Sequence, residues 1–248
     1  MQKDREFPSA TDADARAAAL AFARAMATWF EAELGPRLLG FYLLGSLAHG
    51  GFNRRYSDID VGLIAAEPLS EAVLEAMRAH GRAIAPDQAA KTSLFWTDRG
   101  FSVGRFPPLD RADYLDHGVP LVERERVRPP RPTIADVRAY LGGAPFERWA
   151  ETARRMAALD RLEPAERKPY LRALLYPARF VYSWITGGMA SNDDAVAFLA
   201  ERAPDGLDVA LAERALACRH AAADPDLLFP ERRLLPAQVE GCARIIAG

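Results

Sequence analysis

Two short apolar runs, at residues 38–44 and 58–65, flank a polar segment in the first third of the chain. Each run is continuous and bounded by turn-forming residues, which predicts a pair of strands buried on both faces. A third run of this kind lies at residues 92–97. Helical patterns at residues 12–34 and 70–84 precede the first run and separate the second from the third. This alternation favours an α/β organisation for the first half.

The rest of the chain has a different pattern. Residues 101–106 predict an edge strand, and residues 110–117 predict a short helical turn after two prolines. The proline-rich residues 126–132 cannot hold regular hydrogen bonding and are interpreted as a linker. From residue 133 onward only helical patterns occur. We therefore expect an α+β protein, with an N-terminal domain of mixed sheet and helices at residues 1–125 and an all-α helical bundle at residues 133–248.

Composition limits the classes of function. The chain has 248 residues, of which 50% are hydrophobic, enough for one large or two small domains. A formal net charge of −2 excludes the bulk basic field that attracts nucleic acids, so any phosphate site must be local. Residues 1–10 contain no apolar core of an export signal, and no run reaches the length of a membrane span. Cys218 and Cys242 lack metal-ligand spacing. We expect a soluble, cytoplasmic protein with reduced thiols.

The polar segment between the first two predicted strands contains the residues suited to chemistry. It begins with Gly45 and Ser46, directly after a buried strand. Glycine lets the backbone pass close to a ligand, while the serine hydroxyl and free main-chain amides can bind an anion, especially if a helix starts there. These two residues therefore predict a phosphate-binding turn.

The same segment ends with two carboxylates, Asp58 and Asp60. Alternate residues of a strand point to the same face, so the two side chains should lie close together and attract a cation. Mg²⁺ typically takes one or two protein carboxylates and completes its shell with water and substrate phosphates. A purely structural interpretation remains open, in which Asp58 caps a turn and Asp60 pairs with Arg54 or Arg55.

The combined pattern of Gly-Ser at residues 45–46 and Ser-Asp-Ile-Asp at residues 57–60 resembles the signature of the polymerase-β-like nucleotidyltransferase superfamily. The resemblance implies a Mg²⁺-bound nucleoside triphosphate, with Ser46 on the phosphates and Asp58 and Asp60 as catalytic metal ligands. Gly45 and Ser57, as parts of the motif, are further candidates for binding the nucleotide. The implied reaction is attack of an acceptor hydroxyl on the α-phosphate, with pyrophosphate leaving.

A second resemblance lies in the helical half. Residues 170–195 are similar to the C-terminal domain of the adenylyltransferases that modify streptomycin and spectinomycin. Arg179 falls where that family has an arginine close to the ATP phosphates. The resemblance implies transfer of AMP from ATP to a hydroxyl of an aminoglycoside-type antibiotic. Its acceptor would be a polyhydroxylated or cationic small molecule held between the two domains, with no nucleic acid or membrane as partner.

The chain departs from the family at two positions. The family has a third carboxylate on the strand after the Asp-x-Asp strand, where this chain has Lys91, which can neither ligate Mg²⁺ nor act as a ready base. Asp98, at the far end of that predicted strand, is the only candidate there for a substitute catalytic carboxylate. Asn192 stands where the antibiotic-modifying enzymes have a lysine. These departures leave an alternative open, namely a degenerate nucleotidyltransferase-fold protein that binds nucleotide or ligand without transfer. Nucleic-acid polymerisation is a third hypothesis, which the balanced charge disfavours.

Overall fold

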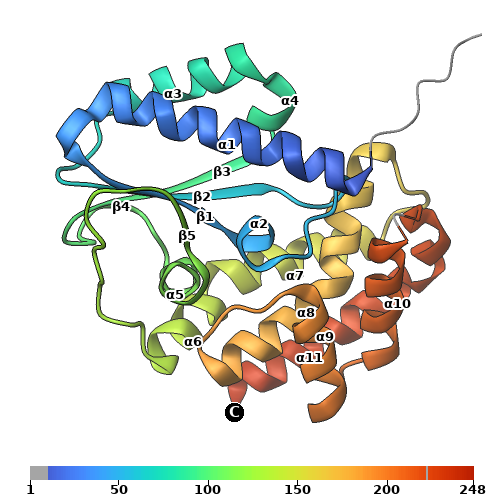
Figure 1. Ribbon diagram of the computed structural model, residues 1–248. Helices are drawn as coiled ribbons and strands as arrows, with labels where there is room; N and C mark the ends of the chain where they lie inside the picture. Colours follow the sequence, from blue (N-terminus) through green and yellow to red (C-terminus); the bar gives the residue numbers. More distant parts are fainter. Residues whose placement is uncertain (1–10, 222) are drawn as a thin grey trace, which may run out of the picture.

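A computed structural model describes residues 11–221 and 223–248 of the chain (Figure 1). Residues 1–10, which carried the expectation that the chain has no export signal, lie outside the described residues. Within the described part, no helix combines the length and the apolarity needed to cross a membrane. Cys218 and Cys242 are buried and are not joined in a disulfide.

The first half is built on a mixed sheet with strand order β4-β3-β2-β1-β5. Strand β1 pairs antiparallel with β2 and with β5, β2 pairs parallel with β3, and β3 pairs antiparallel with β4. The strands are β1 (Leu38–Leu44), β2 (Ile59–Ala65), β3 (Thr92–Asp98), β4 (Gly104–Arg105) and β5 (Val119–Glu123). The three predicted apolar strands are the three central strands. Every residue of β1 is buried, as expected for a strand covered on both faces.

Helices cover both faces of this sheet. On one face lie α1 (Asp12–Leu34), α3 (Glu71–Ile84) and the short α4 (Pro86–Ala89), as Figure 1 shows. Both long helices begin at side-chain caps. Thr11 Oγ1 accepts a 3.1 Å hydrogen bond from the Asp14 amide, and Ser70 Oγ accepts one of 3.3 Å from the Val73 amide. The opposite face packs against α5 (Pro108–His117).

In the described part of the second half every regular element is a helix, as predicted, and α8 lies at its centre. This helix packs against α6, α7, α9, α10 and α11. The bounds are α6 (Ile134–Gly142), α7 (Ala144–Ala157), α8 (Arg167–Thr186), α9 (Asn192–Arg202), α10 (Val209–His220) and α11 (Leu235–Ala247). Three 3₁₀ segments complete the described helices of the chain: η1 (Gly35–Arg37), η2 (Pro164–Glu166) and η3 (Pro225–Leu234). The α+β class, with a sheet followed by a helical bundle, is therefore confirmed.

Several local predictions differ from the structure. The expected edge strand at residues 101–106 is reduced to β4, because Asp98 caps a turn by accepting a 2.8 Å hydrogen bond from the Ser102 amide. Strand β5 was not predicted, since it contains Pro120, which a sheet accommodates at its edge. Residues 124–133 hold neither helix nor strand. The domain bounds of 1–125 and 133–248 with a linker at 126–132 stay a prediction.

Candidate active site

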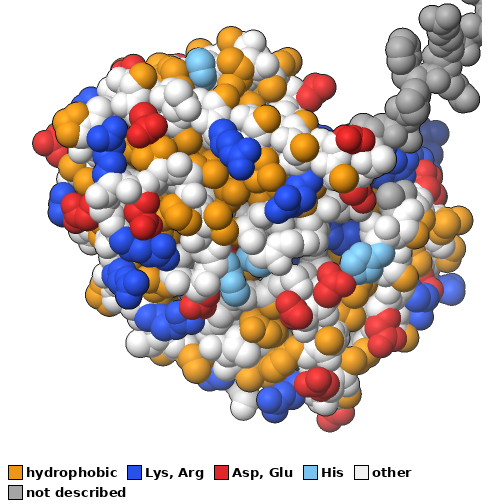
Figure 2. All heavy atoms as spheres, in the orientation of Figure 1, with side chains coloured by type: hydrophobic (Ala, Val, Ile, Leu, Met, Phe, Trp, Pro, Cys, Tyr) orange, Lys and Arg blue, Asp and Glu red, His pale blue; other side chains and the backbone are white. Residues whose placement is uncertain are grey.

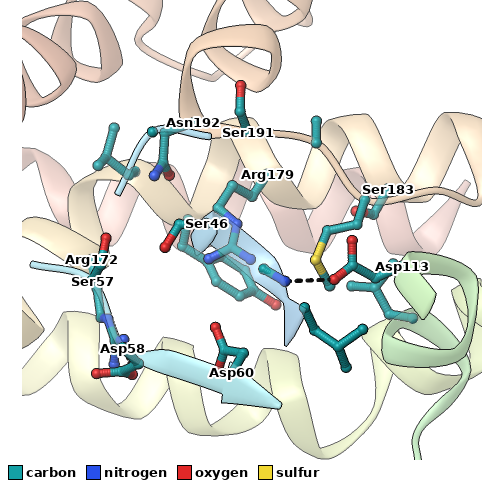
Figure 3. A pocket seen from close by; sticks show the side chains of 18 of the residues that line it. Ser46, Ser57, Asp58, Asp60, Asp113, Arg172, Arg179, Ser183, Ser191 and Asn192 are labelled. Atoms are coloured by element: carbon teal, nitrogen blue, oxygen red, sulfur yellow. Dashed lines mark hydrogen bonds and ion pairs between the residues drawn. The ribbon is translucent and has the colours of Figure 1, made fainter. Parts of the chain in front are cut away.

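A pocket of about 540 Å³ lies between the sheet half and the helical half (Figure 3). The sheet half contributes the ends of β1 and β2, the short helix α2 (Gly45–His49) and α5, while α8 contributes the largest share from the helical half. The Asp, His, Lys and Arg side chains that line it are Asp58, Asp60, Asp110, Asp113, Asp193, His49, Arg105, Arg148, Lys168, Arg172, Arg179 and Arg219. The pocket is therefore highly charged, with both signs drawn from both halves.

The polar segment that leads from α2 to β2 is fixed against α10 and the residues after it. The buried Arg219 side chain donates from Nη2 to Ser57 Oγ at 2.9 Å and to the Gly51 carbonyl at 3.1 Å. Tyr56 Oη donates a 2.7 Å hydrogen bond to the Ala223 carbonyl. Ser57, a predicted nucleotide-binding residue, lines the pocket. Its hydroxyl also accepts a 2.9 Å hydrogen bond from the main-chain N–H of Asn53. The structure thus gives Ser57 a role in shaping the loop.

Gly45 occupies a position that only glycine fits. Its φ of +57° lies in the left-handed region, and a Cβ atom there would lie 2.5 Å from Asp60 Oδ2. The Gly45 amide donates a 2.8 Å hydrogen bond to Oδ2 of the buried Asp113 on α5. The other oxygen of Asp113 lies 3.1 Å from His49 Nε2, at an angle outside that of a hydrogen bond, and this contact is an ion pair when His49 is protonated. The Gly-Ser turn is thereby held between Asp60 and α5.

Asp58 is the last residue before β2, and Asp60 is the second residue of this strand. The two carboxylates nevertheless have different surroundings. Lys168 Nζ donates to Asp58 Oδ1, and Arg172 Nη2 donates to Asp58 Oδ2. Burial raises the pKa of Asp58, but the hydrogen bonds and the charges of Lys168 and Arg172 together outweigh burial and lower this pKa overall. Burial, followed by the charge of Asp58, raises the pKa of Asp60 to about 6, against the opposing charge of Arg179.

Asp110 is a third carboxylate in the pocket that the sequence reasoning missed. It lies in the first turn of α5, the helix that also carries Asp113. Burial, followed by the charges of Asp60 and Asp113, raises the pKa of Asp110 to about 7. A carboxyl group whose pKa lies near neutrality, and which is electrostatically coupled to Asp60, has the properties of a general base. The only available signal in the sequence was that Asp110 precedes Asp113 by about one turn of the same predicted helix.

The prediction that Asp98 reaches the site is wrong. Strand β3 runs parallel to β2, with Ser93 beside Asp60 and Asp98 beside Ala65. Asp98 is therefore about 16 Å along the sheet from Asp60, at the other end of the strands. Its carboxylate caps a turn, accepting a 2.6 Å hydrogen bond from Ser102 Oγ, and it does not line the pocket.

The other predicted nucleotide-binding residues lie together. Ser46 on α2 and Arg179 on α8 both line the pocket, and Figure 3 shows them with Asp60 around the same space. Asn192, the position where the family has a lysine, lines the pocket at the start of α9. Lys91 is exposed and does not line the pocket. The structure thus brings Gly45, Ser46, Ser57, Asp58, Asp60 and Arg179 to one pocket and leaves Asp98 outside it.

The carboxylates of the pocket are suited to a hard cation. Asp60 is a desolvated carboxylate whose charge is disfavoured by its neighbour Asp58, and a divalent cation between them would relieve that repulsion. Among the described residues, no group of three or more His, Cys, Asp or Glu side chains is arranged to hold a metal ion. A pair of carboxylates is nevertheless the usual protein contribution to a Mg²⁺–nucleotide site. The donor set therefore fits Mg²⁺, provided that Asp58 exchanges a bond to Lys168 or Arg172.

The fold, a mixed sheet that carries Gly-Ser and Asp-x-Asp and is followed by a helical bundle, is similar to that of a solved adenyltransferase. A solved structure of spectinomycin adenyltransferase AAD(9) from Enterococcus faecialis, with ATP and spectinomycin, is similar over 94% of this chain and 99% of that chain, with a TM-score of 0.62 and 13% sequence identity. A mutant of the toxin–antitoxin pair MntA–HpeT is similar over 40% of this chain and 73% of that chain, with 18% identity and a TM-score of 0.29, too low to relate the folds. No protein-family model and no curated protein matches the chain.

Proposed function

We propose that the protein is a Mg²⁺-dependent nucleotidyltransferase that transfers AMP from ATP to a hydroxyl group of a small molecule, with an aminoglycoside-type antibiotic as the acceptor class. The observation that carries the proposal is the joint placement of Ser46, Asp58, Asp60 and Arg179 in one pocket between the two halves. The similarity of fold to spectinomycin adenyltransferase supports ATP as donor and an antibiotic as acceptor.

Asp58, Asp60, Ser46 and Arg179 each have a part in this reaction. Mg²⁺ held by Asp58 and Asp60 would supply the positive charge that offsets the triphosphate and the charge developing on it during transfer. Ser46 and Arg179 bind and orient the phosphates from opposite halves of the pocket. Because the binding groups come from both halves, the pocket brings donor and acceptor together in the space between the halves. Such positioning, together with neutralisation of charge, is the main source of rate enhancement in reactions of this type.

The transfer step is an in-line displacement at the α-phosphorus. The acceptor oxygen forms a bond to the α-phosphorus, while the bond from that phosphorus to the oxygen bridging it to the β-phosphate breaks. The bond's electron pair leaves with pyrophosphate. The hydroxyl proton passes to Asp110, whose pKa of about 7 suits a base working near neutral pH. Asp110 thus takes the role of the third carboxylate of the family, whose strand position is occupied by Lys91 in this chain.

The pocket also suits an acceptor with hydroxyl and amino groups. Asp193 from the helical half and Asp110 from the sheet half both line it, and each can accept hydrogen bonds from a cationic or polyhydroxylated ligand. Tyr140, which also lines the pocket, offers an aromatic ring against which a sugar ring can pack. On the face drawn in Figure 2, basic and acidic side chains are interspersed, and no basic stripe for a nucleic-acid strand is seen there.

Pyrophosphate release from Mg-ATP in the presence of spectinomycin, streptomycin and related aminoglycosides tests the proposal. We expect release that requires an acceptor and is lost in Asp58→Asn and in Asp60→Asn. Calorimetric binding of ATP in the same samples separates this from the alternative, a degenerate protein that binds nucleotide without transfer. The bonds of Lys168 and Arg172 to Asp58 are the observation that favours the alternative. ATP binding without release for any acceptor would support it.

A further inference from the structure

Three cationic side chains follow one another along the pocket-facing side of α8. Lys168 and Arg172 are about one turn apart, and Arg179 follows about two turns later, so all three lie on the same side of the helix. Arg179 is a predicted nucleotide-binding residue, whereas Lys168 and Arg172 have no role in the function proposed above. Their placement next to Asp58 calls for an explanation of its own.

Lys168 and Arg172 together use both oxygens of Asp58. Lys168 binds Oδ1 and Arg172 binds Oδ2, and Lys168 Nζ also lies 3.5 Å from the Ser57 carbonyl. The side chains of Lys168 and Arg172 are 27% and 53% exposed, and that of Asp58 is 21% exposed. An ion pair at this depth is partly desolvated, and its two cations come from a different half of the protein than its carboxylate. Together the two cations outnumber the single negative charge that they neutralise.

This arrangement opposes full binding of a divalent cation to Asp58. A Mg²⁺ ion coordinates carboxylate oxygens at about 2.0–2.1 Å, the same atoms that Lys168 and Arg172 now contact. Placing two further positive charges beside an ammonium and a guanidinium group would also be strongly unfavourable. A metal ion and the two α8 cations therefore compete for Asp58.

Both side chains have the reach and the freedom to leave Asp58 without leaving the pocket. Lysine has a flexible four-carbon stem, and the half-exposed Arg172 has solvent on one side. A triphosphate lying between Asp60 and Arg179 would bring several negative charges to the face of α8 on which the two cations lie. Arginine and lysine both bind phosphate oxygens with strong, charge-assisted hydrogen bonds.

We propose that Lys168 and Arg172 are phosphate-binding residues that neutralise Asp58 while the site is empty and transfer to the triphosphate when a metal–nucleotide complex binds. The inference rests on the proposed function, since it assigns these residues to the same nucleotide. It explains how an empty site can keep Asp58 charged and in place. It also makes binding of the metal ion alone weak and binding of metal and nucleotide together cooperative.

The double variant Lys168→Met with Arg172→Met tests the inference through binding, without any turnover. Methionine is unbranched and favours helix, so α8 should be retained. In the double variant we expect Mn²⁺ alone, measured by electron paramagnetic resonance, to bind at least about tenfold more tightly than in the wild type. We expect the preference of ATP for the Mn²⁺-bound protein, measured by calorimetry as the ratio of the ATP affinities with Mn²⁺ and in EDTA, to fall at least about tenfold.

Matched controls separate this from a general effect of charge or folding. Arg16→Met with Arg24→Met removes the same charge from exposed positions of α1 that do not line the pocket, and should leave both affinities within about twofold. Lys168→Arg with Arg172→Lys keeps both charges and should restore wild-type behaviour. The single variant Arg172→Met, at a half-exposed position, should show part of both effects if the double variant fails to fold.

Two results would overturn the inference. An unchanged or weaker affinity for Mn²⁺ in the double variant would mean that the α8 cations do not compete with a metal for Asp58. An unchanged ratio of the ATP affinities with Mn²⁺ and in EDTA would mean that they do not transfer to the phosphates. Failure of the proposed function looks different, because pyrophosphate release would be missing for every acceptor while both binding shifts remained.

Discussion

The main-chain amide of Gly45 donates a 2.8 Å hydrogen bond to the carboxylate of Asp113, a residue 68 positions further along the chain. This bond ties the Gly-Ser turn to α5, the helix that carries Asp110. The turn that would bind phosphate and the carboxylate proposed as base are therefore held by one rigid contact. Asp113 is only 2% exposed, so the contact is well shielded from water.

Removing the Asp113 carboxylate should loosen this contact. Asp113→Ala leaves the Gly45 amide and His49 without their partner, and we expect the free energy of unfolding to fall by about 2–3 kcal/mol. Asp113→Asn keeps an oxygen that can accept the amide hydrogen bond and should lower it by less than about 1.5 kcal/mol. Urea unfolding of both variants measures the difference. Equal losses for alanine and asparagine would show that the hydrogen bond to Gly45 is not what matters.

Gly45→Ala should damage the site more than the fold. The left-handed backbone would raise the energy of the folded state by about 1–2 kcal/mol, and the new Cβ atom would push against Asp60 Oδ2. We expect the rate of transfer to fall at least about tenfold because Asp60 is displaced. Gly35→Ala is the matched control, since Gly35 has a φ of +55° and nothing within 4 Å of its added Cβ. Equal activity in the two variants would contradict the close approach of Gly45 to Asp60.

Asp110 and Asp98 give opposite expectations. Asp110→Asn removes the proposed base and should lower kcat by about 10²–10⁴, with little change in the dissociation constant of ATP. Asp98→Asn changes a turn at the far end of β3 and should leave kcat within about twofold of the wild type. Steady-state assays of pyrophosphate release compare the two. A severe loss in Asp98→Asn alone would show that the catalytic carboxylate is supplied from the strand after all.

The raised pKa values of Asp60 and Asp110 predict a pH-dependent penalty on folding in EDTA. Their ordinary pKa is 3.8, and the folded values are about 6 and about 7. The stability contributed by the neutral forms is thus complete below pH 3.8 and is lost as pH rises to 6 for Asp60 and 7 for Asp110. At pH 8, the free energy of unfolding of Asp60→Asn and of Asp110→Asn should each exceed that of the wild type by about 1–3 kcal/mol. At pH 4 the variants and the wild type should differ little.

Chemical denaturation at the two pH values checks this expectation. Saturating Mg²⁺ with ATP should reduce the gain in stability from Asp60→Asn at pH 8, because the bound cation favours the ionised carboxylate. A gain of the same size at both pH values would contradict the assignment of these carboxyl groups as desolvated and mutually repelling.

The sequence predicted those parts of the fold that follow from local patterns. Continuous apolar runs identified the three central strands, and helical periodicity identified the helical half. The Gly-Ser and Asp-x-Asp motifs correctly placed Ser46, Asp58 and Asp60 near one another, because the two segments are joined by a short connection between paired strands. Arg179 reached the same pocket from the other half, as the family resemblance implied.

The parts that were missed depend on tertiary contacts or on strand direction. Asp98 was expected near the site, but the parallel pairing of β3 with β2 carries it away, and no local feature of the sequence reports the direction of pairing. Lys168 contacts Asp58 across 110 positions of sequence, and Asp110 comes to Asp60 only because α5 packs beneath the sheet. Contacts of that kind arise from the packing of whole elements, which single-residue patterns do not encode.

Mass spectrometry of the acceptor tests the central claim most directly. Wild-type protein, Asp60→Asn and Asp110→Asn are each incubated with Mg-ATP and a panel of spectinomycin, streptomycin and other aminoglycosides. We predict that the wild type converts at least one acceptor to a product heavier by one adenylyl group, with one pyrophosphate released per product, and that both variants lose this conversion. An acceptor panel left unmodified by a wild-type protein that binds ATP would contradict the assignment as an adenylyltransferase of such antibiotics.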